Sequence, residues 1–145
     1  MVTVQQVLRE KGFHVWSIGP EATVYEAVAL MAERGVGALP VLDWANHLVG
    51  IISERDYTRK IVLKDRSSRD TKVREIMTSE VIHVELSDSI DDCMVLMSEN
   101  RIRHLPVLEG DRVVGVLSIK DVLNTIIVEK QMLIEQLEHY ITGTG

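Results

Sequence analysis

Apolar residues recur along the chain at two kinds of spacing, and the same order of spacings occurs twice. Intervals of three and four residues indicate amphipathic helices, as for Val24, Ala27 and Met31, whereas short apolar runs bounded by turn residues indicate strands. The first half is predicted to contain, in order, a helix at 3–10 ended by Gly12, a strand at 15–18, a helix at 23–34 ended by Gly35, strands at 38–42 and 48–52, and a helix from 53 to about 63.

A polar, charged segment at 64–70 indicates a linker, and the order then repeats. The second half is predicted to contain a short helix at 73–77, a strand at 81–84, a helix at 89–100, a hairpin of 104–108 with 112–117, and an unusually long helix at 121–140. Each half therefore reads helix, strand, helix, strand, strand, helix.

Three local motifs recur at nearly one spacing. Pro40 and Pro106 stand 66 positions apart within similar apolar strands, and so do the helix starts at 23–26 and 89–92, which both read as capping boxes. The stretches 50–56 and 115–121 stand 65 positions apart, and both read glycine, two apolar residues, serine, two variable residues, aspartate. This common spacing predicts a tandem duplication.

Composition narrows the class of protein. The 145 residues are 46% hydrophobic and 26% charged, as in ordinary globular proteins, and their aromatic content of 4% predicts an aliphatic core. The apolar runs are too short for a membrane span, and no secretion signal is recognised. The single Cys93 cannot form an internal disulfide, so a cytoplasmic location is predicted. A net charge of −6 argues against nucleic-acid binding.

Catalytic and metal-binding signatures are missing from the sequence. There is no HExxH, P-loop or GxSxG motif, and the histidines show no metal-type spacing. We therefore predict a protein that is not an enzyme and holds no metal, with a nucleotide-processing enzyme as the less favoured alternative.

The repeated serine-to-aspartate stretch is the strongest candidate for ligand chemistry. Each copy follows a short strand and opens a helix, so it places a hydroxyl, a carboxylate and a helix N-terminus at one point. Helix N-termini attract anions, which makes this a suitable place for a phosphorylated ribose. The same Ser-x-x-Asp pattern is also a capping box that needs no ligand. Both interpretations can hold at once.

The proline-valine strand, the glycine-to-aspartate stretch and the tandem spacing together resemble the cystathionine-β-synthase (CBS) domain, and the pair resembles a CBS-pair or Bateman module. The resemblance implies an α+β fold of two pseudo-twofold-related repeats, at 1–66 and 67–145, each a small three-stranded sheet packed with helices. It also implies two clefts between the repeats that bind AMP, ADP, ATP, NAD or S-adenosylmethionine, with AMP the most expected, and signalling to an unnamed downstream protein by conformational change.

The resemblance also assigns residues to the two sites. In both, the aspartate binds the ribose hydroxyls, since an ionised carboxylate only accepts hydrogen bonds. The site of Asp121 is predicted to comprise Trp16, Val36, Gly37, Arg103, His104, Ser118, Lys120 and Asp121. The site of Asp56 is predicted to comprise Gly37, Ala38, Ser53, Arg55, Asp56, Ile82, Ile102 and Arg103. Because the Arg103-His104 pair has no counterpart in the first half, the Asp121 site should prefer the more phosphorylated ligand or bind AMP more tightly.

The C-terminal helix carries an apolar stripe over about five turns, including Leu123, Ile127, Leu133 and Leu137. One small domain rarely needs so long a helix, so a homodimer through this helix is predicted. Folding of the helix back onto its own domain is the alternative. A purely structural dimeric adaptor with empty clefts remains the second hypothesis for function.

Overall fold

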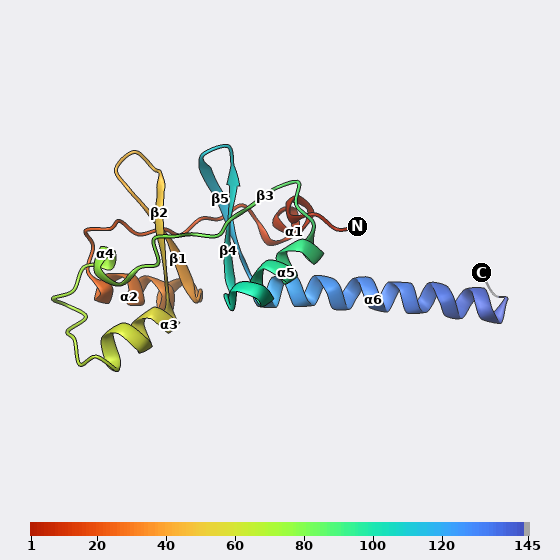
Figure 1. Ribbon diagram of the computed structural model, residues 1–145. Helices are drawn as coiled ribbons and strands as arrows, with labels where there is room; N and C mark the ends of the chain where they lie inside the picture. The colour runs from red at the N-terminus through yellow and green to blue at the C-terminus, as the bar shows by residue number, and fades with distance from the viewer. Residues whose placement is uncertain (144–145) are drawn as a thin grey trace.

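The computed structural model describes residues 1–143, so the last two residues of the predicted second repeat lie outside it. Two β-hairpins lie next to each other in the middle of the molecule, helices pack around them, and the last helix extends far beyond this body (Figure 1). The elements are α1 (Val4–Lys11), α2 (Val24–Arg34), β1 (Ala38–Leu42), β2 (Leu48–Ser53), α3 (Glu54–Tyr57), the π-helical η1 (Thr58–Val62), α4 (Val73–Ile76), β3 (Val84–Glu85), α5 (Ile90–Asn100), β4 (His104–Glu109), β5 (Arg112–Ser118) and α6 (Ile119–Thr142).

The two sheets differ in their third strand. In the second repeat, β3 pairs in parallel with β4, which pairs antiparallel with β5. In the first repeat, β1 and β2 form an antiparallel pair, and the predicted strand at 15–18 is reduced to a single bridge between Ile18 and Val41. The chain turns at Gly19–Pro20, so no pairing continues beyond Ile18. The strand predicted at 81–84 is also shifted, to Val84–Glu85.

Side-chain caps fix where the helices begin. Thr3, Thr23, Ser53 and Ser118 each form a complete capping box with the residue three positions on. Ser89 accepts a hydrogen bond from the Asp92 N–H, but the structure shows no return bond, so the box predicted there is half formed. The predicted helix starts are therefore correct to within a residue, except for α6, which begins at Ile119, two residues before the predicted start.

The helix predicted from 53 to 63 is not one regular α-helix. It comprises the single turn α3 followed by η1, in which the Leu63 N–H bonds to the Thr58 carbonyl five residues earlier. Its counterpart in the second repeat, α6, is a regular helix of 24 residues.

The two hydrophobic cores exchange their short helices. Val4 and Leu8 of α1, the first helix of the chain, are buried in the core formed by β3, α5, β4, β5 and α6, which we call the second core. Val73 and Ile76 of α4 are buried in the core formed by α2, β1 and β2. Backbone bonds hold this exchange, from the Val4 N–H to the Asp88 carbonyl and from the Val24 N–H to the Thr71 carbonyl. The division into repeats at 1–66 and 67–145 stays a prediction from the sequence. In the structure, each of these segments contributes one helix to the core of the other.

Candidate ligand-binding clefts

The two serine-to-aspartate stretches lie where β2 meets α3 and where β5 meets α6. At each junction the first backbone N–H of the helix donates to the carbonyl that directly precedes the paired strand. Glu54 N–H bonds to the Gly37 carbonyl before β1, and Ile119 N–H bonds to the Arg103 carbonyl before β4. These paired bonds hold each junction beside the segment that precedes β1 or β4. The result is one cleft beside Asp121 and another beside Asp56.

The Asp121 cleft has a volume of about 350 Å³, within the range of small-molecule sites. Seven of the eight residues predicted for it line it: Trp16, Val36, Gly37, His104, Ser118, Lys120 and Asp121. Arg103 does not line it and faces the other cleft.

Asp121 is held on two sides. Its Oδ2 atom accepts the Ser118 N–H at 2.9 Å, which completes the cap of α6, and accepts Lys11 Nζ at 2.6 Å. Burial of this carboxyl raises its pKa, but the bonds from Lys11 and from the Ser118 N–H outweigh that effect, so the pKa of Asp121 lies below its ordinary value. Its other oxygen, Oδ1, accepts no hydrogen bond within residues 1–143. Asp121 therefore caps its helix, and its second oxygen can still accept a hydrogen bond.

Trp16 lines the Asp121 cleft with one ring face already covered. The Arg34 guanidinium lies 4.0 Å from the centroid of its ring, and the His14 ring lies nearly parallel at 6.3 Å. Cation–π contacts of this kind orient an exposed indole. A base stacking on Trp16 would therefore have to use the remaining face or displace Arg34.

The Asp56 cleft has a volume of about 320 Å³. Seven of the eight predicted residues line it: Gly37, Ser53, Arg55, Asp56, Ile82, Ile102 and Arg103. Ala38 instead lines the Asp121 cleft. Asp56 caps its own helix through Ser53 and forms a 3.0 Å ion pair with Lys60, one helical turn later. Among the described residues, Asp56 forms no side-chain hydrogen bond or ion pair with the other repeat, unlike Asp121.

Gly37 and His104 form the wall that the two clefts share, because both residues line both clefts. A Cβ atom on Gly37 would lie 3.0 Å from Glu54 Oε1 and 3.2 Å from His104 Nε2, so the wall leaves no room for a side chain there. Burial lowers the pKa of His104, and the nearby Lys11 and Arg103 lower it further. The imidazole is therefore neutral at pH 7 and can donate or accept a hydrogen bond.

Charges distribute unequally between the clefts. In the Asp121 cleft, Lys11 and Lys120 face a single carboxylate. In the Asp56 cleft, two arginines face the carboxylates of Glu54, Asp56 and Glu80. Arg55 is further engaged, because it donates to the Arg101 carbonyl at 2.7 Å. The Asp121 cleft is thus the more favourable of the two for an anion.

Several lining residues were not predicted from the sequence. The additional residues are Lys11, Gly12, His14, Gly35 and Val116 in the Asp121 cleft, and Ile51, Glu54, Thr78, Glu80 and Val81 in the Asp56 cleft. Lys11 is the most important of these for the chemistry of the cleft, because it binds Asp121. It stands at the end of α1, and the packing of α1 in the second core cannot be predicted from a short local pattern. Glu54 could have been found, since it stands between Ser53 and Arg55 in the repeated stretch.

The repeated architecture and its paired clefts define a class of protein, the CBS-domain proteins. The family model of the CBS domain matches the chain twice, at residues 4–63 and 73–128, so the chain belongs to this family. Among the described residues, no helix combines the length and apolar character needed to cross a bilayer, and no three His, Cys, Asp or Glu side chains are grouped as metal ligands.

Individual relatives support the same assignment. The mitochondrial CBS domain-containing protein CBSX3 of Arabidopsis thaliana is 39% identical over 97% of this chain and 72% of its own length. A candidate signal-transduction protein with CBS domains from Burkholderia ambifaria is 47% identical over 88% of this chain and 95% of that one, with a TM-score of 0.83. A CBS-domain protein from Agrobacterium tumefaciens is 31% identical, with a TM-score of 0.80 over 84% of this chain and 91% of that one. This chain is thus similar over most of its length to proteins built of CBS domains.

Proposed function

We propose that this protein is a non-catalytic regulatory module that binds adenosine nucleotides in its two clefts. The observation that carries the proposal is the Asp121 cleft, where a carboxylate with one open oxygen, a capped helix N-terminus and two lysines border a volume of about 350 Å³. The carboxylate suits the two hydroxyls of a ribose. The lysines and the helix N-terminus suit phosphate. Trp16, Val36 and Gly37 form the apolar side on which an adenine would rest.

AMP is the ligand we favour, with ADP, ATP, NAD and S-adenosylmethionine as further candidates. The excess of cations over carboxylates in the Asp121 cleft supports stronger binding of phosphate there than in the Asp56 cleft. Because Lys11 ties α1 to Asp121, a ligand at this carboxylate would compete with Lys11 or recruit it to its phosphate. Either event changes the contacts of α1, and a ligand shifts a conformational equilibrium only through such differential contacts.

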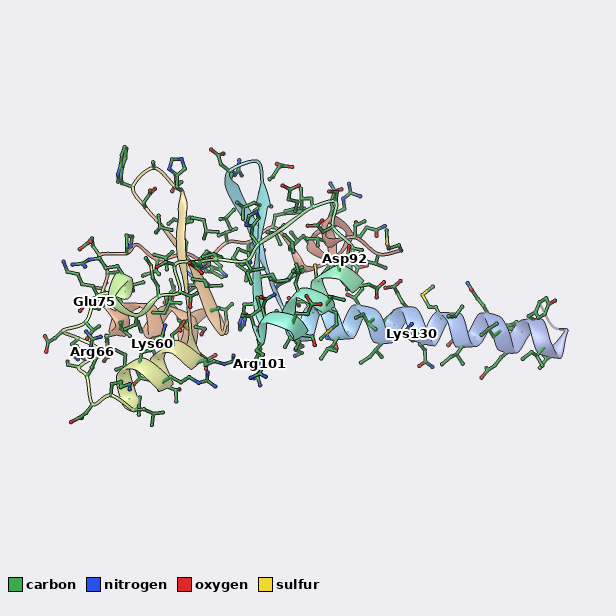
Figure 2. All side chains as sticks on the ribbon, viewed as in Figure 1. Lys60, Arg66, Glu75, Asp92, Arg101 and Lys130 are labelled. Carbon is green, nitrogen blue, oxygen red and sulfur yellow. The ribbon has the colours of Figure 1, made fainter. Side chains whose placement is uncertain are left out.

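A thermal-shift panel of AMP, ADP, ATP, NAD, NADH and S-adenosylmethionine tests the proposal. The variant Asp121→Asn keeps the size of the side chain but loses its charge, and should lose most of the stabilisation by AMP. Asp92→Asn is the matched control, because Asp92 occupies the same position after a capping serine but lies at α5, away from both clefts (Figure 2). Stabilisation by no compound in the panel, or an Asp121→Asn response equal to that of Asp92→Asn, would contradict the proposal.

A structural dimeric adaptor with empty clefts is the second candidate function, favoured by the apolar residues exposed along α6. Under both functions we propose that two copies of the chain assemble, that a further protein receives the signal, and that the protein works in the cytoplasm with neither nucleic acid nor membrane as a partner. If the panel gives no shift while the chain is dimeric, the adaptor is the better description. Product analysis after incubation with ATP or NAD addresses the less favoured enzymatic alternative.

A further inference from the structure

The later part of α6 projects beyond the body of the protein, and its apolar side chains are exposed. Val122 is buried and Ile119 and Ile126 pack against the second core, which fixes the beginning of the helix to the body. From Ile127 onward every described residue of α6 except Glu129 is exposed. Figure 1 shows this part leaving the body, and Figure 2 places Lys130 on it. About two thirds of a helix of 24 residues is therefore exposed to solvent.

Seven of the nine exposed large apolar side chains of α6 lie on one side of the helix, and Val128 and Met132 lie off it. Successive residues of an α-helix advance by about 100°, so residues three, four and seven apart share a face. One stripe of the helix contains Leu123, Ile127, Leu133, Ile134, Leu137, Tyr140 and Ile141, all exposed. Lys130 is the single charged residue inside this stripe. We call these seven residues with Lys130 the α6 stripe.

The exposed area is large enough for a stable contact. At roughly 60–120 Å² for each large apolar side chain, the seven side chains offer on the order of 600 Å². Two such stripes packed together would bury about 1,200 Å², the lower limit for a specific protein interface. A helix segment this short is also marginal by itself in water. Both facts indicate that the α6 stripe is covered in the functional protein.

We propose that the stripe is covered by the α6 stripe of a second copy, with the two helices antiparallel and the twofold axis at Ile134. In that arrangement Ile134 faces its own counterpart, and Ile127 faces Ile141 of the other copy, because these residues lie seven positions on either side of Ile134. The pairs at the centre and on both sides of it are therefore apolar in both copies.

Lys130 distinguishes the antiparallel from the parallel arrangement. In a parallel pair in register, the two Lys130 side chains would meet in the middle of the apolar contact, where like charges repel. In the antiparallel pair they are about two turns apart. Each then lies level with Glu138 of the other copy, since Lys130 and Glu138 stand four residues on either side of Ile134. A long lysine side chain can reach that carboxylate at the rim.

This inference deepens the proposed assembly of two copies by naming its surface, and it does not depend on nucleotide binding. The first test is the mass in solution of the full chain, measured by light scattering for wild type and two variants. Ile134→Glu places a charge at the twofold axis and should give a monomer. Met132→Glu is the matched control, because Met132 is equally exposed (56% against 52%) but lies on the opposite face of α6, and it should stay dimeric.

Disulfide trapping tests the direction of the helices. Cys93 is buried, so introduced cysteines are the ones that oxidation will join. Ile134→Cys should form a covalent dimer with itself. Ile127→Cys should not, because two copies of residue 127 lie about 21 Å apart in the antiparallel pair, but it should join to Ile141→Cys in a mixture.

Each alternative outcome overturns the proposal. A monomeric wild type shows that the stripe is not covered by a second copy, and a dimer that survives Ile134→Glu uses another surface. Self-joining of Ile127→Cys shows a parallel pair. Because Ile134 lies far from both clefts, Ile134→Glu should still respond to AMP if the proposed function is correct. The experiments therefore distinguish a failure of the proposed nucleotide binding from a failure of the proposed helix pairing.

Discussion

Replacing Lys11 by methionine tests whether one side chain ties the first helix to the second repeat. Lys11 Nζ donates to Asp121 Oδ2 at 2.6 Å and to the Val116 carbonyl at 2.8 Å. A charge-assisted hydrogen bond contributes about 1.5–3 kcal/mol. Solvent screens this one, because the Lys11 side chain is 42% exposed. We therefore expect Lys11→Met to lower the free energy of unfolding by about 1–2 kcal/mol at pH 7.

The effect should depend on pH with a definite sign. The pKa of Asp121 is lower in the folded protein than its ordinary value of 3.8. Such a group stabilises the fold fully above its unfolded pKa, and the contribution is lost as pH falls through the folded pKa. The difference between wild type and Lys11→Met should therefore be constant from pH 7 to pH 5. It should shrink as the pH is lowered toward 3.

Urea unfolding followed by circular dichroism at several pH values measures both quantities. Lys120→Met is the matched control, since Lys120 lines the same cleft but forms no side-chain hydrogen bond or ion pair within the described chain. It stands in the first turn of α6, where a cation opposes the helix dipole. Its loss should leave stability unchanged or raise it slightly, while weakening AMP binding. Equal losses in the two variants, or a Lys11→Met loss at pH 3 as large as that at pH 7, would refute this reasoning.

Three further outcomes follow from packing. Gly50→Ala should destabilise the fold by about 1–3 kcal/mol in urea unfolding, because its Cβ would lie 2.5 Å from Met77 Sδ and 3.0 Å from the Thr78 carbonyl. Gly19→Ala, which meets nothing within 4 Å, serves as its control and should change little. Leu8→Ala should cost about 2–5 kcal/mol, since Leu8 is fully buried in the second core; a loss below 1 kcal/mol would show that α1 is not docked there. Burial, aided by Asp88 and Asp92, raises the pKa of Cys93 to about 11, so its thiol should react with iodoacetamide at pH 8 only after urea is added.

The features that depend on local spacing could be predicted from the sequence. Helix starts are fixed by a side chain and the residue three positions on, as at Ser118 and Asp121, and such pairs are visible in the sequence. The clefts were predicted because the two serine-to-aspartate stretches are repeated, and because the resemblance to the family supplied their partners. Each cleft contains seven of its eight predicted residues, although their role in binding stays a prediction.

The sequence could not predict what depends on contacts between distant segments. The tie from Lys11 to Asp121 joins positions 110 residues apart and follows from the docking of α1 in the second core. Arg103, predicted for both clefts, lines only the Asp56 cleft, and Ala38 lines the Asp121 cleft in place of the Asp56 cleft. The side to which a strand residue such as Ala38 points is set by strand register, and a one-residue shift reverses it. The strand predicted at 15–18 is reduced to one bridge, between Ile18 and Val41, although its apolar residues fit a strand.

The exchange of α1 and α4 between the cores has a consequence for synthesis on the ribosome. The core around β1 and β2 is complete once α4 has emerged, so it can close early. The first helix to be made, α1, must wait until the strands and helices between residues 84 and 122 exist, because its buried side chains pack only there. Until then Val4 and Leu8 remain uncovered on the nascent chain, where chaperones bind such segments. If the chain were divided between the repeats, the first fragment would contain α1 and the second would contain α4. Neither fragment would then contain the short helix that completes its own core.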